Sequence, residues 1–175
     1  SSREFELELT DAVAPAASLF TPANNTYWNT AQNYTVNLSD AGGISNATLY
    51  IYNTTSGNLV NQTFINVPSN PLSITVGIVV SLVDGIYHWL YSVLDISNNL
   101  AYSGNNTITI DTVNPLIVYA PSNPADGITI NISNFSISVL ITELNYANAT
   151  FRIYNSTYNL INESSASGNY YQNFT

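Results

Sequence analysis

Residues 46–53, Asn-Ala-Thr-Leu-Tyr-Ile-Tyr-Asn, return about one domain later as residues 148–155, Asn-Ala-Thr-Phe-Arg-Ile-Tyr-Asn. Both copies alternate between apolar and polar side chains, a pattern typical of β-strands with one dry face and one wet face. Such self-similarity at a long period predicts a chain built from like modules in tandem.

The repeat also predicts which face of each strand is buried. Arg152 stands where the first copy has Tyr50, and arginine is rarely buried without a partner. The side chains on this face should therefore be exposed: Thr48, Tyr50 and Tyr52. Those on the opposite face are apolar in both copies and should lie inside: Ala47, Leu49 and Ile51, with Ala149, Phe151 and Ile153.

A second repeat delimits the modules. The pattern Asp-x-Val-x-Pro occurs at residues 11–15 and at residues 111–115. Proline cannot join a central strand ladder, so both segments read as short linkers. Between them, alternating runs are separated by turns rich in Gly, Asn and Asp. Seven strands are expected, near residues 18–20, 34–38, 47–52, 59–65, 72–80, 86–94 and 107–110, which is typical of an antiparallel β-sandwich.

Residues 84–89, Asp-Gly-Ile-Tyr-His-Trp, resemble the tyrosine corner and following strand of immunoglobulin-like domains. Together with the repeated strand and linker, they make the chain similar to the tandem immunoglobulin-like modules of archaeal and bacterial surface proteins. The chain has no cysteine, so it resembles the disulfide-free branch. The resemblance implies that the Tyr87 hydroxyl bonds to nearby backbone. It also implies four side chains pointing inward: Tyr87, Trp89, Tyr91 and Val93.

The expected fold is therefore all-β, with tandem immunoglobulin-like antiparallel β-sandwiches. Residues 1–10 form an N-terminal strand, residues 11–113 a complete module, and residues 114–175 a second module that lacks its last strands. Residues 4–9, Glu-Phe-Glu-Leu-Glu-Leu, alternate perfectly. They read either as the closing strand of a preceding module or as a donor strand for a neighbour's groove, through Phe5, Leu7 and Leu9. Excision from a longer repeat array explains the two ends equally well.

Composition excludes several kinds of partner. Only 7% of the 175 residues are charged, the net charge is −9, and the only cations are Arg3 and Arg152. A nucleic-acid-binding protein needs clustered Lys and Arg, so we expect no nucleic-acid partner. The longest apolar run, residues 71–83, is too short for a membrane-spanning helix, so we expect no direct membrane insertion.

Asn-x-Ser/Thr acceptor sites are dense along the chain. They predict an extracellular or cell-surface location, with covalent N-linked glycans replacing charge as the solubilising coat. The alternative is that Asn- and Thr-rich strands create such sites without their being used. The predicted acceptors are Asn24, Asn33, Asn37, Asn46, Asn53, Asn61, Asn105, Asn131, Asn134, Asn148, Asn155, Asn162 and Asn173.

No group of residues predicts catalysis. His88 is the only histidine, cysteine is absent, and no nucleophile–base pair or phosphate-binding loop is visible. We therefore expect no enzyme, and no catalytic residue, cofactor or metal. Calcium at the joints marked by Asp11 and Asp111 is an open alternative in such modules, although no calcium-loop spacing supports it.

These observations favour a non-enzymatic structural component of an extracellular, glycosylated surface structure, such as a filament, a surface layer or a stalk. The low charge and dense acceptors favour an archaeal source. Chains of this kind could form homo-oligomers or polymers by head-to-tail β-strand donation. The alternative is an adhesin or a carbohydrate-binding module that uses Tyr-rich strand faces, including Tyr50, Tyr52, Tyr154, Tyr158, Tyr170 and Tyr171.

Overall fold

A computed structural model describes residues 11–129, 131, 134–166 and 171–174. All regular structure among them is β-strand, which confirms the all-β prediction. None of the described residues lies in a helix that could span a membrane. The chain divides into two compact units, unit 1 ending at Thr112 and unit 2 beginning at Val113. The predicted N-terminal strand, residues 1–10, lies outside the described residues.

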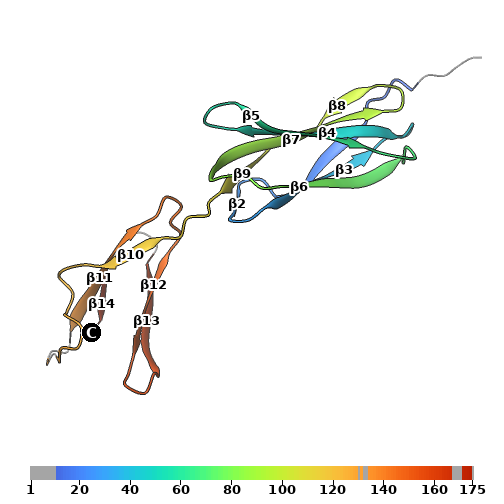
Figure 1. Cartoon of the computed structure of the whole chain (residues 1–175). Coiled ribbons are helices and arrows are strands. Elements are labelled where there is room, and N and C mark those ends of the chain that lie inside the picture. Colours follow the sequence, from blue (N-terminus) through green and yellow to red (C-terminus); the bar gives the residue numbers. More distant parts are fainter. Residues whose placement is uncertain (1–10, 130, 132–133, 167–170, 175) are drawn as a thin grey trace, which may run out of the picture. The chain divides into compact units, whose positions relative to one another are not determined.

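Unit 1 is a sandwich of two sheets (Figure 1). One sheet has the order β1-β3-β6 and the other the order β2-β9-β7-β4-β5, with β8 paired to β7. All pairs are antiparallel except β2 with β9, which run parallel. The strands are β1 (Ala16–Thr21), β2 (Thr26–Trp28), β3 (Gln32–Ser39), β4 (Ile44–Asn53), β5 (Leu59–Asn66), β6 (Ser73–Val80), β7 (Gly85–Asp95), β8 (Leu100–Tyr102) and β9 (Asn106–Ile110).

The core of unit 1 lies between the sheets and is centred on Trp89. Its ring lies edge-on to Tyr34 of β3, with ring centroids 5.2 Å apart, and edge-on to Tyr91 at 6.3 Å. Burying each such large side chain stabilises the fold by about 1.5–3 kcal/mol. The predicted inward faces are confirmed, because all of these side chains are at most 2% exposed: Ala47, Leu49, Ile51, Tyr87, Trp89, Tyr91 and Val93. The predicted exposure of Thr48 is wrong, because this short side chain on the outer face of β4 is only 8% exposed between β5 and β7. Tyr50 and Tyr52 on the same face are half-buried.

The tyrosine corner is also confirmed. The Tyr87 hydroxyl donates a 2.9 Å hydrogen bond to the carbonyl of Val83, four residues upstream, while the ring is buried. This bond fixes the turn that leads into β7 against the core. The corner therefore sets the position at which Trp89 and Tyr91 enter the sandwich.

Two strands of unit 1 were not predicted from the sequence. Thr26–Trp28 and Leu100–Tyr102 are three residues each, too short to show alternation. Their strand state comes from pairing with β9 and β7, respectively. Tertiary contacts therefore determine that these two segments form strands.

Unit 2 repeats part of the same topology. β10 (Leu116–Tyr119), β11 (Phe135–Thr142) and β14 (Tyr171–Phe174) form a sheet of order β10-β11-β14, the counterpart of β1-β3-β6. β12 (Ala149–Tyr154) and β13 (Leu160–Ala166) form a hairpin, the counterpart of β4 and β5. Within the described part of the chain, unit 2 has no counterpart of β7, β8 or β9.

Candidate functional site

β4 and β12 differ in how many strands they pair with among the described residues. In unit 1, β4 lies between β5 and β7 and pairs with both. Its counterpart β12 pairs only with β13 among the described residues. An edge of this kind presents backbone N–H and C=O groups that can pair with another strand. Among the described residues, the side of β12 that corresponds to the β7 side of β4 is therefore unpaired.

The core side chains behind this edge are only partly covered. Leu49 and Ile51 of β4 are fully buried, whereas Phe151 and Ile153 of β12 are half-buried. Their orientation agrees with the prediction, since Arg152 and Tyr154 on the other face are exposed. Completing the sheet beside β12 would remove more apolar surface from water, which favours binding of a further strand.

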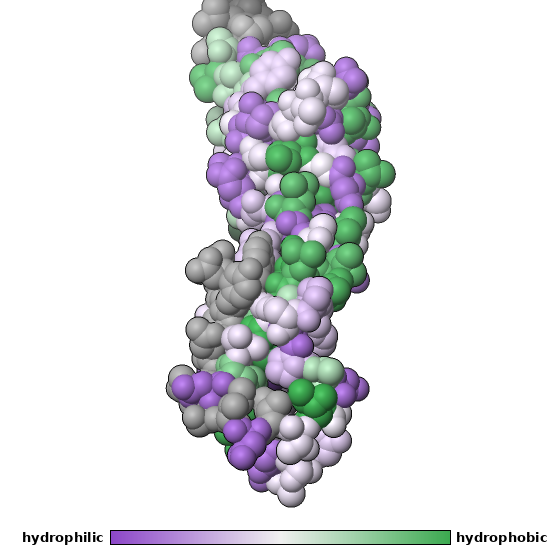
Figure 2. Space-filling model, turned by 90° about the vertical axis from the view of Figure 1, so that its left-hand side faces the viewer, coloured by the Kyte–Doolittle hydropathy of each residue, from purple (hydrophilic) through white to green (hydrophobic). Residues whose placement is uncertain are grey.

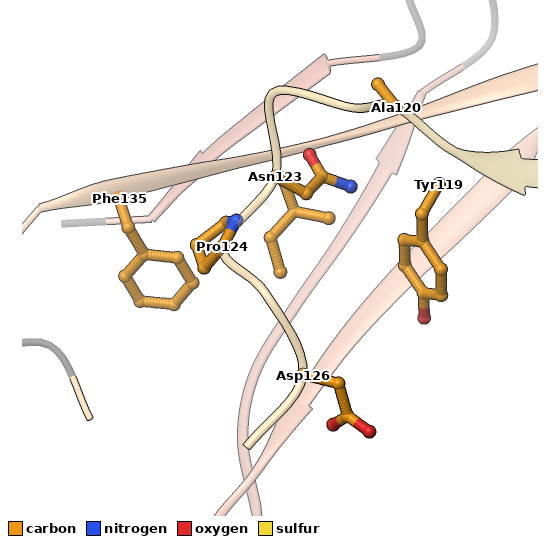
Figure 3. Close-up of a pocket in the computed structure, with 7 residues that line it drawn as sticks. Tyr119, Ala120, Asn123, Pro124, Asp126 and Phe135 are labelled. Carbon is orange, nitrogen blue, oxygen red and sulfur yellow. The ribbon is translucent and has the colours of Figure 1, made fainter. Parts of the chain in front are cut away.

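A cavity of about 680 Å³ lies in unit 2. Figure 3 shows the rings of Phe135 and Tyr119 on opposite sides of the view, with Asp126 on the loop below. The internal repeat makes Phe135 the counterpart of Tyr34, which contacts Trp89 in unit 1. The residues that line the cavity are Tyr119, Ala120, Asn123, Pro124, Asp126, Phe135 and Ile137.

Other apolar side chains of unit 2 are also exposed. On β10, Leu116 and Ile117 are 60% and 59% exposed, and Leu140 of β11 is 63% exposed. Figure 2 shows hydrophobic patches, in green, between hydrophilic residues on one side of the molecule. Apolar surface therefore remains available on this unit for contact with a further segment.

The outer face of β12 carries a cation. Arg152 is the one Lys or Arg among the described residues, and its Nε lies 2.6 Å from Oε2 of Glu163 on β13. Both side chains are about half exposed, so water screens the pair and its contribution to stability is small, about 0–1 kcal/mol. On its other side, Arg152 lies along the edge of β12 that is unpaired among the described residues.

The predicted donor residues are Phe5, Leu7 and Leu9. All three lie outside the described residues. Their pairing therefore stays a prediction.

None of the predicted glycan acceptors whose side chains are described is buried. Those on exposed positions are Asn24, Asn33, Asn37, Asn105, Asn131, Asn134, Asn148, Asn155 and Asn162. Those on half-buried positions are Asn46, Asn53 and Asn61. The side chain of Asn173 lies outside the described set. A glycan needs an accessible Asn side chain, so these positions are compatible with occupancy, which stays a prediction.

Two acceptors also organise turns. The Oδ1 atom of Asn53 accepts hydrogen bonds from the backbone N–H groups of Thr55 and Ser56, at 3.0 and 2.9 Å. Asn155 does the same for Thr157 and Asn159, at 3.0 and 2.9 Å. These are Asx turns, which close the hairpin loops. A glycan attaches to Nδ2, so both acceptors can carry one while Oδ1 keeps its bonds.

Three aspartates meet at one end of unit 1. Carboxylate oxygens of Asp11, Asp40 and Asp95 lie within 4.8 Å of one another. Oxygen ligands of this kind are those that calcium prefers, so the three could hold a divalent cation. Calcium was considered at the two joints marked by Asp11 and Asp111. Of these two residues, the group contains Asp11 and not Asp111. Asp40 and Asp95 precede turns in the sequence, and only the fold brings them together.

Asp95 is held in its ionised form by its surroundings. Its side chain is 1% exposed, and this burial raises its pKa. Hydrogen bonds from the Asn99 amide and from nearby backbone N–H groups outweigh burial, so the pKa lies below its usual value. The bonds from Ser97 N and Asn99 N to Oδ1 are both 2.8 Å. Asp95 thus fixes the turn between β7 and β8.

The remaining polar candidates are dispersed. Nδ1 of His88 lies 2.9 Å from the Thr107 hydroxyl on the next strand, and His88 is not in the aspartate group. Tyr50 and Tyr52 lie on the outer face of β4, with near-parallel rings (17°) whose centroids are 6.5 Å apart. Tyr154 and Tyr158 of unit 2 are 51% and 88% exposed.

Comparison with known proteins gives no family and only distant structural similarities. Neither a scan against protein-family models nor a search of curated proteins gives a match. Among solved structures, the chain is similar to fibronectin(III)-like modules of CbhA from Clostridium thermocellum, at 8% identity and a TM-score of 0.43. The match covers 91% of this chain and 78% of that one.

Two other solved structures are also similar to this chain. CopC from Methylosinus trichosporium OB3b is 21% identical, with a TM-score of 0.40, over 55% of this chain and 94% of that chain. A tetra-tandem repeat from the extending region of a large adhesion protein is 18% identical, with a TM-score of 0.39. That match covers 93% of this chain and 40% of the other. Such low identities and TM-scores carry no argument about function.

Proposed function

We propose that this chain is a non-enzymatic structural component of an extracellular, glycosylated cell-surface structure, such as a filament, a surface layer or a stalk. The observation that carries the proposal is the edge of β12 that is unpaired among the described residues, with Phe151 and Ile153 half-buried behind it. A unit with an open sheet edge and a partly covered core is suited to receive a strand from another chain.

The partner would be a second copy of the same chain. Strand addition gives affinity through main-chain hydrogen bonds and through apolar side chains that enter the acceptor's core. A contact between one end of a molecule and a different surface of the next is head-to-tail and does not close on itself. Repeated addition would therefore give a filament.

The amino-acid composition supports the proposed extracellular location. With 7% charged residues, the surface depends on Asn, Ser, Thr and Tyr for its solubility, and accessible acceptors occur in both units. Glycans at these positions would add polar surface and shield the outer faces of the sheets. The same combination favours an archaeal cell surface as the source.

Sedimentation of the full chain over a range of concentrations tests assembly. We expect species larger than the monomer. A variant with Phe5, Leu7 and Leu9 each replaced by Asp should sediment as a monomer, because charged side chains cannot enter the acceptor's core. The matched control replaces Glu4 and Glu8 by Gln and should still assemble. A full chain that stays monomeric at all concentrations contradicts the proposal.

A second candidate function is carbohydrate binding. The near-parallel Tyr50 and Tyr52 rings favour it, because aromatic rings on a sheet face can stack on sugar rings. A glycan array with the full chain is the test, and selective binding that is lost in Tyr50→Ala supports this function. Tyr27→Ala, an exposed tyrosine of β2 that is not among the candidates for binding, is the control. Absence of binding, or equal binding by both variants, contradicts a site at Tyr50.

A further inference from the structure

We propose that β6 of unit 1 pairs edge to edge with β6 of a second copy of the chain, antiparallel and about a two-fold axis. The contact would continue the sheet β1-β3-β6 of one copy into the same sheet of the next. It joins chains side by side, at a surface to which neither residues 1–10 nor unit 2 contribute. The contact itself does not depend on the proposed function.

β6 is a border strand without protection. Among the described residues it pairs only with β3, and this register continues without a break from Ser73 to Val80. The strand contains no charged residue and no proline. Sheets normally protect their borders with charges, proline, bulges or very short strands, because an open border can pair with another chain. β6 has none of these features.

The other border strands of unit 1 each have such a feature. The pairing of β1 shifts in register between Leu19 and Thr21, and Pro22 follows the strand directly. β2 and β8 are three residues long each. The pairing of β5 also shifts in register, and this strand carries the predicted glycan acceptor Asn61. The contrast selects β6 as the border that is open to a partner.

The predicted glycan acceptors leave this border uncovered. No acceptor occurs between Asn61 and Asn105, a stretch that includes the whole of β6. Asn33 and Asn37 lie at exposed positions on the neighbouring strand β3, and side chains project from the face of a sheet. A partner strand joins in the plane of the sheet, so glycans on β3 would flank the contact without occupying it.

Pairing along β6 would cover apolar surface. Val79 on the outer face is 69% exposed, and Leu72, just before the strand, is 61% exposed. The inward-facing side chains pack against the core but remain half-buried: Ile74, Val76, Ile78 and Val80. A partner strand would remove part of this surface from water, which favours the contact.

The distribution of charge favours a second copy as the partner. The described part of unit 1 contains no Lys, Arg or Glu, and its aspartates lie at its two ends. Asp11, Asp40 and Asp95 meet at one end. Asp84 lies at the other end, because β7 begins directly after Asp84 and finishes at Asp95.

This distribution also favours the antiparallel arrangement. A border without carboxylates has nothing to attract a basic partner, but it fits an equally neutral strand, and β6 is such a strand. Two copies joined along β6 therefore bring no like charges into contact. Antiparallel pairing also keeps the two groups of three aspartates at opposite ends of the pair, which limits their repulsion.

Symmetry limits the possible registers. A two-fold axis perpendicular to the sheet keeps the inward side chains of both copies on the same side. Residues that lie directly opposite each other then share a face, so the axis passes through a pair of identical residues. Axes at Val76 and at Gly77 pair the most residues of β6. The first sets Ser73 opposite Val79, and the second sets Thr75 opposite Val79.

A single contact of this kind is small. Two short strands joined at their borders belong to the smallest class of protein interfaces, which is typical of weak and transient association. Two isolated chains would therefore separate readily. Along chains that are already assembled head to tail, the contact is repeated and its effect multiplies. This role, the side-by-side packing of filaments or of a surface layer, rests on the proposed function.

Disulfide trapping tests the contact, since the chain has no cysteine of its own and a covalent bond captures short-lived pairs. Full-length Val79→Cys chains are mixed with Ser73→Cys chains, and separately with Thr75→Cys chains. Antiparallel pairs have Cα atoms about 4.5 or 5.5 Å apart, and both spacings allow a disulfide. Under mild oxidation, we expect one of the two mixtures to give at least about fivefold more mixed dimers than dimers of like chains.

Chains of one kind set the background. Two Ser73 residues, or two Val79 residues, lie at least about 14 Å apart in either register, so Ser73→Cys or Val79→Cys alone should cross-link only by collision. Mixed dimers and like dimers in equal amounts would indicate random collision in both mixtures. That result would overturn the proposal.

A charge on the border gives an independent test. In the cysteine-bearing chains, Val76→Lys should remove the excess of mixed dimers, because a partner strand would cut the inward-facing ammonium off from water. Ile65→Lys is the matched control, since Ile65 is a half-buried, inward-facing side chain of the border strand β5. It should leave the excess unchanged, and thermal melts check that both variants fold.

An excess that survives Val76→Lys, or that Ile65→Lys removes equally, would overturn the contact at β6. If Val76→Lys does not fold, the cysteine mixtures decide alone. Trapped mixed dimers from a chain that stays monomeric in sedimentation would support the β6 contact and contradict head-to-tail assembly. Large species in sedimentation without any excess of mixed dimers would contradict the β6 contact and leave head-to-tail assembly standing.

Discussion

The hydroxyl of Tyr91 donates a 2.7 Å hydrogen bond to the backbone carbonyl of Tyr34, across the interior of unit 1. The two residues belong to different sheets, so the bond ties the sandwich together at its centre. The Tyr34 hydroxyl is itself buried without a hydrogen-bond partner among the described residues. In the same core, therefore, the Tyr91 hydroxyl is hydrogen-bonded and the Tyr34 hydroxyl is not.

Replacing each tyrosine by phenylalanine should have opposite consequences. Tyr91→Phe removes the bond between the sheets and should lower the free energy of unfolding by about 1 kcal/mol. Tyr34→Phe removes a buried hydroxyl that has no partner and should leave stability unchanged or raise it. Urea unfolding monitored by fluorescence measures both. A larger loss in Tyr34→Phe than in Tyr91→Phe would contradict this account of the core.

The same tyrosines predict a loss of stability in alkali. Burial raises the pKa of Tyr34 and of Tyr91 above the ordinary value of 10.0, with the neighbouring Tyr87 adding to the rise at Tyr34. The unfolded chain then ionises first, so stability is fully present below pH 10 and falls as the pH rises further. Unfolding curves between pH 8 and pH 12 should show this decline. A stability that stays constant over that range would contradict it.

The lowered pKa of Asp95 predicts how the stability of the protein changes in acid. Burial raises its pKa, but the bonds from Asn99 and the turn N–H groups lower it below 3.8. The contribution of Asp95 is therefore present above pH 3.8 and is lost as the pH falls through its lower folded value. Asp95→Asn should be less stable than the parent at pH 7, and the difference should shrink by pH 2. Thermal melts across this range measure it, and a difference that grows in acid would contradict the assignment.

Glycan attachment and turn formation can be separated at two acceptors. Asn53→Gln and Asn33→Gln should each remove one glycan, seen as a step in intact mass. In the unglycosylated chain, Asn53→Gln should cost about 1 kcal/mol because its turn bonds are lost. Asn33 is exposed on β3, so its replacement should change stability by less than about 0.5 kcal/mol. A native mass equal to 19.0 kDa would contradict glycosylation altogether.

Much of the fold could be predicted because it depends on local patterns. The alternation in residues 46–53 and the exchange of Tyr50 for Arg152 were enough to predict the inward faces of β4 and β12, but not the burial of Thr48 on the outer face. The Asp-Gly-x-Tyr pattern placed Tyr87 at its corner, confirmed by the bond to Val83. Such features follow from residue period and turn chemistry, which the sequence carries directly.

The parts that could not be predicted depend on contacts between distant segments. β2 and β8 are strands only because β9 and β7 lie beside them. Asp11, Asp40 and Asp95 read as separate turn residues, and their proximity follows from the sandwich topology. The cavity beside Phe135 also arises from packing, since no motif marks its lining residues.

Electron microscopy of the purified native material tests the central claim most directly, because it asks whether the open unit joins one chain to the next. The account predicts regular filaments that shorten or disappear when Phe5, Leu7 and Leu9 are replaced by Asp. Separate particles of monomer size from the unaltered chain would contradict strand donation between chains.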